Sequence, residues 1–188
     1  MTWLVVGLGN PEPKYAKNRH NVGFMVASEL ARRMGEGFTS KFKGELARGR
    51  LGPQDLLVLK PMTYMNLSGV SVASAATFYK VPLEQIVVIH DELDLPFPDV
   101  KVKVGGGHAG HNGLRSIFEH VGRDFVRVRC GIGRPPHGDV AGFVLSDYSK
   151  DEAAGLPDVI DTAARAVELI VDRGPLAAMN EIHTKARA

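Results

Sequence analysis

The chain has 188 residues, of which 44% are hydrophobic and 23% are charged, and its formal net charge is +2. This length suits a single domain with a core of ordinary size. The sequence has no apolar run long enough to cross a bilayer, no signal peptide pattern at the N-terminus, and one cysteine, Cys130, so an internal disulfide is excluded. We therefore expect a soluble, cytoplasmic protein.

The first half of the chain alternates predicted strands and helices. A mostly apolar strand is expected at residues 3–8, and after a long loop a helix over about 22–34, where apolar residues share one face. Strands are expected near 44–51 and 55–60, followed by a helix from 68 to about 79. This order is typical of an α/β protein.

The second half continues the alternation. Residues 86–89 are all apolar, as expected of a central strand that is covered on both faces. Strands at 100–104 and 125–132 flank a helix over about 112–121. Ser149 and Glu152 form a capping-box pattern before helices that occupy about 150–187. We predict one catalytic α/β domain, 1–188, with a twisted, mixed and mostly parallel sheet flanked by helices.

The loop after the first strand begins like a dinucleotide-binding turn, with Gly7 and Gly9. The third small residue of that motif is replaced by Glu12, which stands between two prolines. An acidic side chain there would repel a pyrophosphate, so we exclude a nucleotide cofactor. Because ligands bind at the carboxyl ends of strands in open α/β sheets, the polar residues of this loop are expected to face a substrate.

His20 and Asp91 form the predicted centre of the site. Asp91 stands at the polar end of the apolar strand 86–89, where a carboxylate needs a partner. A carboxylate that accepts a hydrogen bond from one imidazole nitrogen raises the basicity of the other, which can then deprotonate water. The alternative is that His20 or Asn21 only caps the following helix.

Water is the expected attacking group. The sequence has no G-x-S-x-G motif, and Cys130 shares a strand face with Val126 and Val128, where burial would make it unreactive.

The glycine-rich stretch 103–114 carries His108, His111 and Asn112 and is expected to form a mobile loop close to the site. Its alternative interpretation is a plain connection in which Asn112 is the helix N-cap.

Three asparagines follow predicted strands. Asn10, Asn66 and Asn112 carry neutral amides that suit holding a carbonyl, ribose hydroxyls or peptide groups. Tyr64 and Met65 precede Asn66, and taken alone an aromatic residue beside methionine is more often part of a core than of a site.

Five sequence blocks together resemble the bacterial-type peptidyl-tRNA hydrolase family. They are GLGNP with RHN-x-GF, KP-x-TYMNLSG, HDELDLP, GGGH-x-GHNGL and R-x-GIGRP, in family order from about residue 4 to 146. The resemblance implies hydrolysis of the ester that joins a peptide to the 3′ ribose of tRNA, with no metal or other cofactor. It also implies a cytoplasmic monomer that binds the acceptor stem and 3′ end of peptidyl-tRNA, without a membrane or an obligatory protein partner.

The resemblance also implies residue roles. His20 corresponds to the catalytic base, Asp91 to the residue that supports it, and Asn10 to the residue that distinguishes blocked from free aminoacyl ends. Lys103 and Arg129 correspond to basic residues that hold the tRNA 5′ phosphate. The positions that correspond to substrate contacts, with His111 in a mobile gate loop at about 92–113, are Tyr15, Tyr64, Met65, Asn66, His111 and Asn112.

The chain departs from the family pattern at a few positions. Glu12 and Ala109 stand where glycine is usual, Met62 replaces a commonly polar residue, and Phe97, Pro98 and Asp99 replace a Pro-Gly pair. These changes concern the gate loop and the peptide preference rather than the reaction.

The strands at 100–104 and 125–132 alternate valines with lysines or arginines, so their cations share one face. We expect Lys103 and Arg129 to bind phosphate. The alternative is that the charges protect an exposed sheet edge from pairing, which would explain Lys101 and Arg127.

Two other classes of function are kept open. A metal hydrolase would use His108 and His111 with an acidic residue at 91, 92 or 94, although two histidines in a glycine-rich loop are a weak metal signal. A tRNA-binding module without chemistry would use the basic strands, but it would not need a histidine supported by an aspartate.

Overall fold

A seven-stranded mixed sheet forms the centre of the computed structural model, which describes residues 1–185. The strands lie in the order β2-β3-β4-β1-β5-β7-β6. Their bounds are β1 Thr2–Gly7, β2 Thr39–Lys41, β3 Gly44–Leu51, β4 Gln54–Pro61, β5 Ile86–Glu92, β6 Val100–Val104 and β7 Val126–Gly131.

The four inner strands β4, β1, β5 and β7 run parallel. β3 and β2 continue the sheet antiparallel on one side, and β6 pairs antiparallel with β7 on the other. The predicted α/β fold with a mixed, mostly parallel sheet is thus confirmed. Because parallel strands share a direction, the carboxyl ends of β1 and β5 meet at one edge, where His20 and Asp91 were expected.

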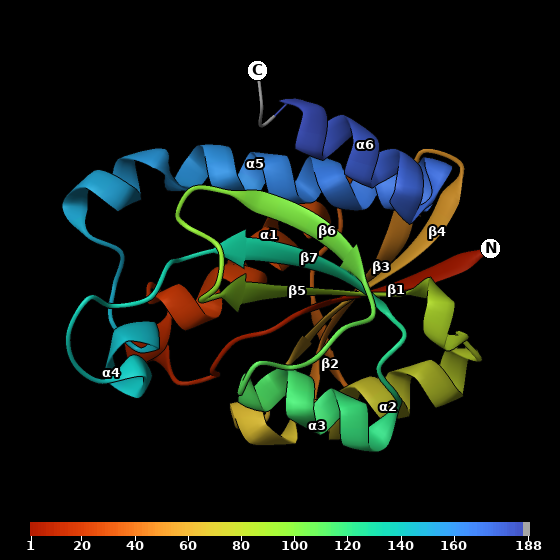
Figure 1. The fold of residues 1–188 in the computed structure, drawn as a ribbon. Helices are drawn as coiled ribbons and strands as arrows, with labels where there is room; N and C mark the ends of the chain where they lie inside the picture. Colours follow the sequence, from red (N-terminus) through yellow and green to blue (C-terminus); the bar gives the residue numbers. More distant parts are fainter. Residues whose placement is uncertain (186–188) are drawn as a thin grey trace.

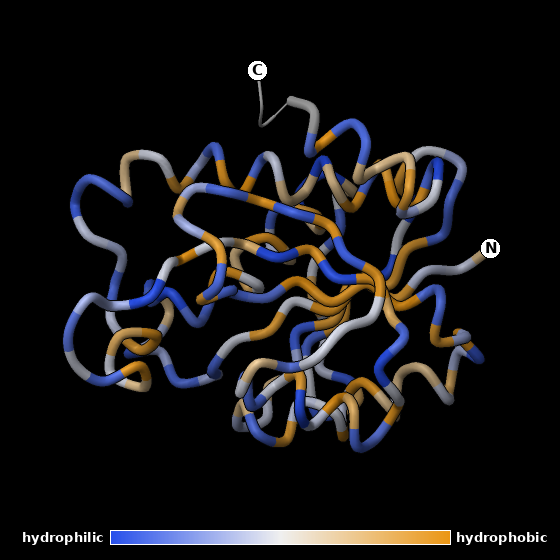
Figure 2. Tube along the Cα trace, in the orientation of Figure 1, coloured by the Kyte–Doolittle hydropathy of each residue, from blue (hydrophilic) through white to orange (hydrophobic). Residues whose placement is uncertain are grey.

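Helices cover both faces of the sheet. Figure 1 shows α5 and α6 on one side and α2 and α3 on the other, and Figure 2 shows hydrophobic residues along the central strands. The longer helices are α1 Val22–Met34, α2 Ser68–Tyr79, α3 Asn112–His120, α5 Lys150–Arg173 and α6 Pro175–Lys185, and α4, Val140–Val144, is a short one. One buried core contains residues of α1, α5 and α6, and the other contains residues of α2 and α3.

The helix boundaries follow local sequence signals. Ser149 and Glu152 form the predicted capping box at the start of α5. Gly35 adopts a left-handed conformation and ends α1. No helix among the described residues is both long enough and apolar enough to cross a membrane. The last two residues of the expected C-terminal helices, 186 and 187, lie outside the described residues.

The structure differs from the expectations in three respects. β2 and α4 were not predicted. The N-cap of α3 is His111 rather than Asn112, which is the first residue of the helix. Arg127 lies on β7, which is not an edge strand, so edge protection does not explain it, whereas Lys101 does lie on the edge strand β6.

Candidate active site

Two glycines bring the start of α1 against the end of β1. A Cβ on Gly7 would lie 2.2 Å from the carbonyl oxygen of Gly23, and a Cβ on Gly23 would lie 2.4 Å from the backbone nitrogen of Leu8. No larger residue fits at either position. The short 3₁₀ turn Arg19–Asn21 that precedes α1 therefore lies beside the end of the sheet, where it brings His20 next to β5.

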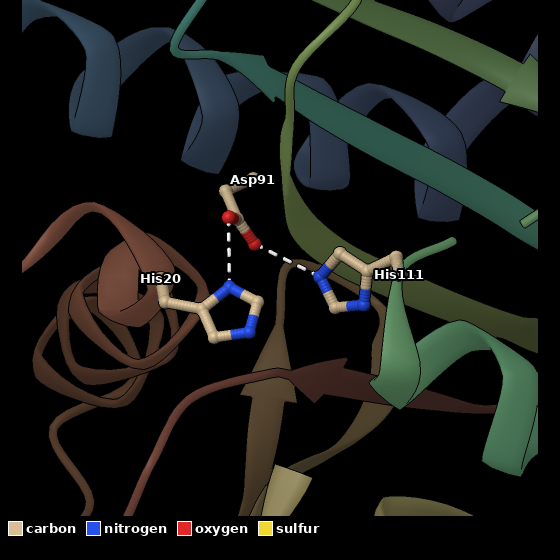
Figure 3. A group of neighbouring side chains, drawn as sticks. All are labelled: His20, Asp91 and His111. Carbon is tan, nitrogen blue, oxygen red and sulfur yellow. Dashed lines mark hydrogen bonds and ion pairs between the residues drawn. The ribbon is translucent and has the colours of Figure 1, made fainter. Parts of the chain in front are cut away.

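Asp91, at the end of β5, binds two histidines (Figure 3). Nδ1 of His20 lies 2.8 Å from Oδ2 of Asp91, and Nε2 of His111 lies 2.9 Å from Oδ1. Asp91 is buried and the His20 side chain is 12% exposed. The predicted pairing of His20 with Asp91 is present, whereas the contact of His111 with the second oxygen was not predicted.

The hydrogen bonds define which nitrogen of each ring carries the proton. Nδ1 of His111 accepts from the backbone amides of Gly113 (3.1 Å) and Leu114 (3.3 Å), so Nε2 is the nitrogen that donates to Asp91. His20 donates to Asp91 through Nδ1, and its Nε2 lies on the far side of the ring from the carboxylate (Figure 3). His20 therefore offers an unprotonated Nε2 when the ring is neutral.

The pKa values of this pair are shifted in opposite directions. Burial lowers the pKa of His20, but the charge of Asp91 and the hydrogen bond to it together outweigh this effect. The net pKa of His20 is therefore raised above its ordinary value of 6.5. Burial alone would raise the pKa of Asp91, but His20 and His111 hold it well below its usual range. Asp91 is thus a carboxylate that raises the basicity of His20 by stabilising its protonated form.

His90, which precedes Asp91 on β5 and points to the opposite face of the strand, packs its ring against that of His111. Its Nδ1 donates to the backbone oxygen of Asp91 (2.8 Å), and its ring meets that of His111 at 72° with centroids 5.3 Å apart. Burial, reinforced by His111, lowers the pKa of His90 to about 3. His90 was not singled out from the sequence, although it directly precedes Asp91.

Asn21 positions Asn10 instead of capping α1. Its Oδ1 accepts from the backbone nitrogen of Asn10 (2.8 Å), and its Nδ2 donates to the Asn10 carbonyl (3.0 Å). Asn21 is the N-cap residue of α1, but its side chain makes no cap hydrogen bond. The two hydrogen bonds hold the loop after β1 in one conformation.

A cleft of about 1080 Å³ opens beside the histidines. Most of the predicted site residues line it, namely Asn10, His20, Tyr64, Met65, Asn66, Asp91, His111 and Asn112. Tyr15, Lys103 and Arg129 lie outside its lining. The structure thus brings together the loops after β1, β4 and β5 with the start of α3.

The glycine-rich part of the predicted gate loop, residues 105–110, is attached to β7 by Arg127. The buried guanidinium of Arg127 donates to the carbonyls of Gly107 (2.6 Å) and Gly106 (2.7 Å). It also lies 5.3 Å from the ring centroids of Phe118 and Phe125. Arg127 therefore holds the loop that leads into His111.

α4, which was not predicted, also lines the cleft. Arg19, next to His20, donates to the carbonyl of Phe143 (3.3 Å), to Ser146 and to Glu152 (2.8 Å). Its guanidinium also stacks on the Phe143 ring, 4.0 Å from the centroid. A single buried arginine thus ties α4 and the start of α5 to the turn that carries His20.

Lys103 and Arg129 lie on neighbouring strands but are not direct partners. In the register of β6 and β7, Lys103 is opposite Arg127 and Lys101 is opposite Arg129. Lys103 is exposed, and Nη1 of Arg129 lies 4.0 Å from Oε1 of Glu92. The two cations share a sheet face as diagonal neighbours.

A metal site built on His108 does not match the structure. His108 accepts from the backbone of Gly110 (3.0 Å) and packs against Phe118. Instead, one ligand atom from each of His20, Asp91 and His111 lies within 4.8 Å of the others. In this arrangement Nδ1 of His20 and Nε2 of His111 already donate to the carboxylate, so a metal ion there would replace both hydrogen bonds.

Cys130 has the buried position expected for it. It lies on β7 among core residues, and burial, with a smaller contribution from Asp91, raises its pKa to about 12. A thiol in this state is a poor nucleophile.

These features define an α/β protein with a histidine hydrogen-bonded to a buried aspartate beside an open cleft, an arrangement typical of enzymes. The family model for peptidyl-tRNA hydrolase matches residues 4–188. The peptidyl-tRNA hydrolase of Geobacter sulfurreducens is 54% identical over 175 residues, which cover 92% of this chain and 91% of the relative. That of Sorangium cellulosum is 52% identical over 189 residues, covering 98% and 85%.

Solved structures agree with this assignment. A crystal structure of peptidyl-tRNA hydrolase from Acinetobacter baumannii matches with a TM-score of 0.91 at 43% identity, covering 96% of this chain and 93% of that one. The chain belongs to the peptidyl-tRNA hydrolase family.

Proposed function

We propose that the chain hydrolyses the ester between the peptide and the 3′ ribose of peptidyl-tRNA by attack of a water molecule that His20 activates. The observation that carries this proposal is the hydrogen bond from Nδ1 of His20 to Asp91 (2.8 Å), which leaves Nε2 as the basic nitrogen beside the cleft. An imidazole held in this way has the geometry of a general base.

In the first step, water attacks the ester carbonyl carbon while Nε2 of His20 takes its proton. The tetrahedral intermediate then releases the 3′ oxygen of the ribose, which takes that proton from the imidazolium. The products are the peptide carboxylic acid, which ionises, and tRNA with a free 3′ hydroxyl. Asp91 stays ionised throughout and stabilises the transient positive charge on His20, in line with its lowered pKa.

The amides around the cleft would bind the neutral parts of the substrate. Asn10, Asn66 and Asn112 lie on different loops that face the same space, and their side chains both donate and accept hydrogen bonds. We assign Asn10 to recognition of the blocked amino end because Asn21 holds its backbone rigidly. Tyr64 and Met65 contribute apolar surface to the same cleft.

The tRNA would approach over β6 and β7. Lys103 and Arg129 share that face and would hold the 5′ phosphate, with the phosphate taking the place of Glu92 beside Arg129. In this arrangement Tyr15, which lies outside the cleft lining, would contact the substrate at its margin. We further propose a cytoplasmic monomer that needs no protein partner, and size-exclusion chromatography with light scattering tests the monomer.

The experiment is hydrolysis of N-acetyl-aminoacyl-tRNA by the purified chain, with and without EDTA. We expect release of the N-acetyl-amino acid at the same rate in both conditions. Loss of activity in EDTA, with recovery on adding Zn²⁺ or Mn²⁺, would instead favour a metal hydrolase built on His20, Asp91 and His111. Tight tRNA binding without product release would favour a binding module.

A further inference from the structure

A second hollow of about 460 Å³ adjoins the cleft and shares Tyr64 with it. Its lining is largely apolar and includes Pro11, Met62, Leu67 and Val70. Tyr64 is 65% exposed and Leu67 is 44% exposed, so two of the large exposed hydrophobic side chains lie at this place. Exposed apolar surface that is gathered around a hollow is typical of a binding site.

The hollow lies on the side of the reacting centre opposite the basic strands. Strand order places β5 and then β7 and β6 on one side of β1, and β4 and then β3 on the other. The hollow is formed by the loop after β1, the loop after β4, the start of α2 with the turn before it, and the turn between β2 and β3. A substrate with its tRNA over β6 and β7 and its ester at His20 therefore directs its peptide toward this hollow.

We propose that the hollow is a subsite for an apolar side chain of the peptide, at a residue beyond the one that carries the ester. This proposal rests on the proposed function. The flexible side chain of Met62 suits several apolar side chains of different shape. The chain would thus prefer peptidyl-tRNAs whose peptide carries an apolar side chain at this position, although hydrolysis of the ester does not require one.

The charged residues at the hollow limit what it accepts. Glu12 and Lys43, both exposed, line the hollow together with its apolar residues. The backbone carbonyl of Lys43 accepts a hydrogen bond from the backbone nitrogen of Met62 (3.0 Å), so the turn that carries Lys43 is attached to the loop after β4. An apolar side chain can contact the apolar lining between these charges, whereas a carboxylate against the same surface would lose part of its hydration.

The expected preference is modest because the hollow is open to solvent. Partial burial of a leucine side chain, compared with serine, should raise kcat/KM by about three- to tenfold. Every substrate carries the same tRNA and the same ester-linked residue, so differences in kcat/KM come from the added peptide residues alone.

The test compares N-acetyl-alanyl-tRNA with the same molecule extended by one, two or three residues. Leucine, serine or aspartate is placed at each added position in turn, and kcat/KM is measured for the wild type, Met62→Asp and Leu176→Asp. Leu176 is 74% exposed on α6 and provides the matched control. We expect leucine to be preferred at one added position, and this preference to disappear in Met62→Asp but not in Leu176→Asp.

Three outcomes would overturn the subsite. The first is equal kcat/KM for leucine and serine at every position in the wild type, and the second is a preference that Met62→Asp retains. The third is an equal loss in Met62→Asp for all substrates, including N-acetyl-alanyl-tRNA, which would assign the hollow to the 3′ nucleotide. If Met62→Asp unfolds below the assay temperature, Leu67→Ser is used in its place. If the wild type hydrolyses none of the substrates, the proposed function is overturned rather than the subsite.

Discussion

His111 donates a hydrogen bond of 2.9 Å from Nε2 to Oδ1 of Asp91, while its Nδ1 caps α3 by accepting from two backbone amides. One side chain thus connects the start of a helix to the carboxylate that orients His20. Because the cap determines the tautomer, the helix itself specifies that Asp91 receives a proton donor on its second oxygen.

His111→Ala removes both interactions. We expect the free energy of unfolding to fall by about 1 kcal/mol from loss of the cap, and kcat to fall because Asp91 loses one of its two donors. Denaturant unfolding and steady-state kinetics measure the two effects. The control is His108→Ala in the same loop, and equal kinetics for the two variants would argue against a role of His111 through Asp91.

Asp91→Asn should shift the acid limb of the pH–rate profile. Asp91 raises the pKa of His20, and the reaction needs His20 unprotonated, so losing the carboxylate lowers that pKa and moves the acid limb to lower pH. The maximal rate should also fall, but less than in His20→Ala, because the base remains. Asp94→Asn, which removes an exposed carboxylate paired with Arg134, serves as the control. An acid limb that stays in place would make Asp91 purely structural.

Arg127→Met should release the loop 105–110 from β7. Two charge-assisted hydrogen bonds to Gly106 and Gly107 are lost, so amide hydrogen exchange in this loop should accelerate about tenfold or more. KM should rise more than kcat changes, since the loop forms part of the cleft wall. Arg123→Met, which removes an exposed arginine that also stacks on Phe118, is the matched control. Unchanged exchange in Arg127→Met would show that the loop is held by other contacts.

Lys103→Ala combined with Arg129→Ala should weaken binding of every tRNA substrate. The slope of log K against log salt concentration should flatten by roughly 0.7–0.9 for each phosphate contact that is lost. The double variant should also stop distinguishing tRNA with a 5′ phosphate from tRNA without one. Arg50→Ala combined with Arg173→Ala removes two exposed charges elsewhere and controls for net charge. If the Lys103/Arg129 variant discriminates the two tRNAs as well as the wild type does, the two residues do not hold the phosphate.

Much of the fold was predictable because its strands carry strong patterns. The apolar run at 86–89 and the alternation at 100–104 each describe a strand that the structure contains. β2 has three exposed residues and α4 has no buried residue, so neither leaves a periodic signal. The sheet order is also invisible in a single sequence, which is why edge protection stayed open as an alternative for Arg127 until β7 was placed inside the sheet.

The candidate site was predictable where a buried charged side chain requires a hydrogen-bond partner. Asp91 at the end of an apolar strand indicated a buried acid that needs a partner, and His20 is a hydrogen-bond partner of that acid in the structure. The position of His111 depends on the loop before it, where the φ angles of Gly105, Gly106, Ala109 and Gly110 are positive. It also depends on the hydrogen bonds of Arg127 to this loop, which join segments far apart in sequence. Residue patterns alone do not contain that information.

The proposed role of His20 is tested most directly by single-turnover hydrolysis of N-acetyl-aminoacyl-tRNA by His20→Ala at saturating enzyme. General-base catalysis commonly contributes about 10²- to 10⁴-fold, so we expect a loss of that size with nearly unchanged tRNA affinity. His120→Ala, which changes an exposed histidine on α3, should keep the wild-type rate. A His20→Ala enzyme that retains more than about a tenth of the wild-type single-turnover rate would contradict His20 as the base.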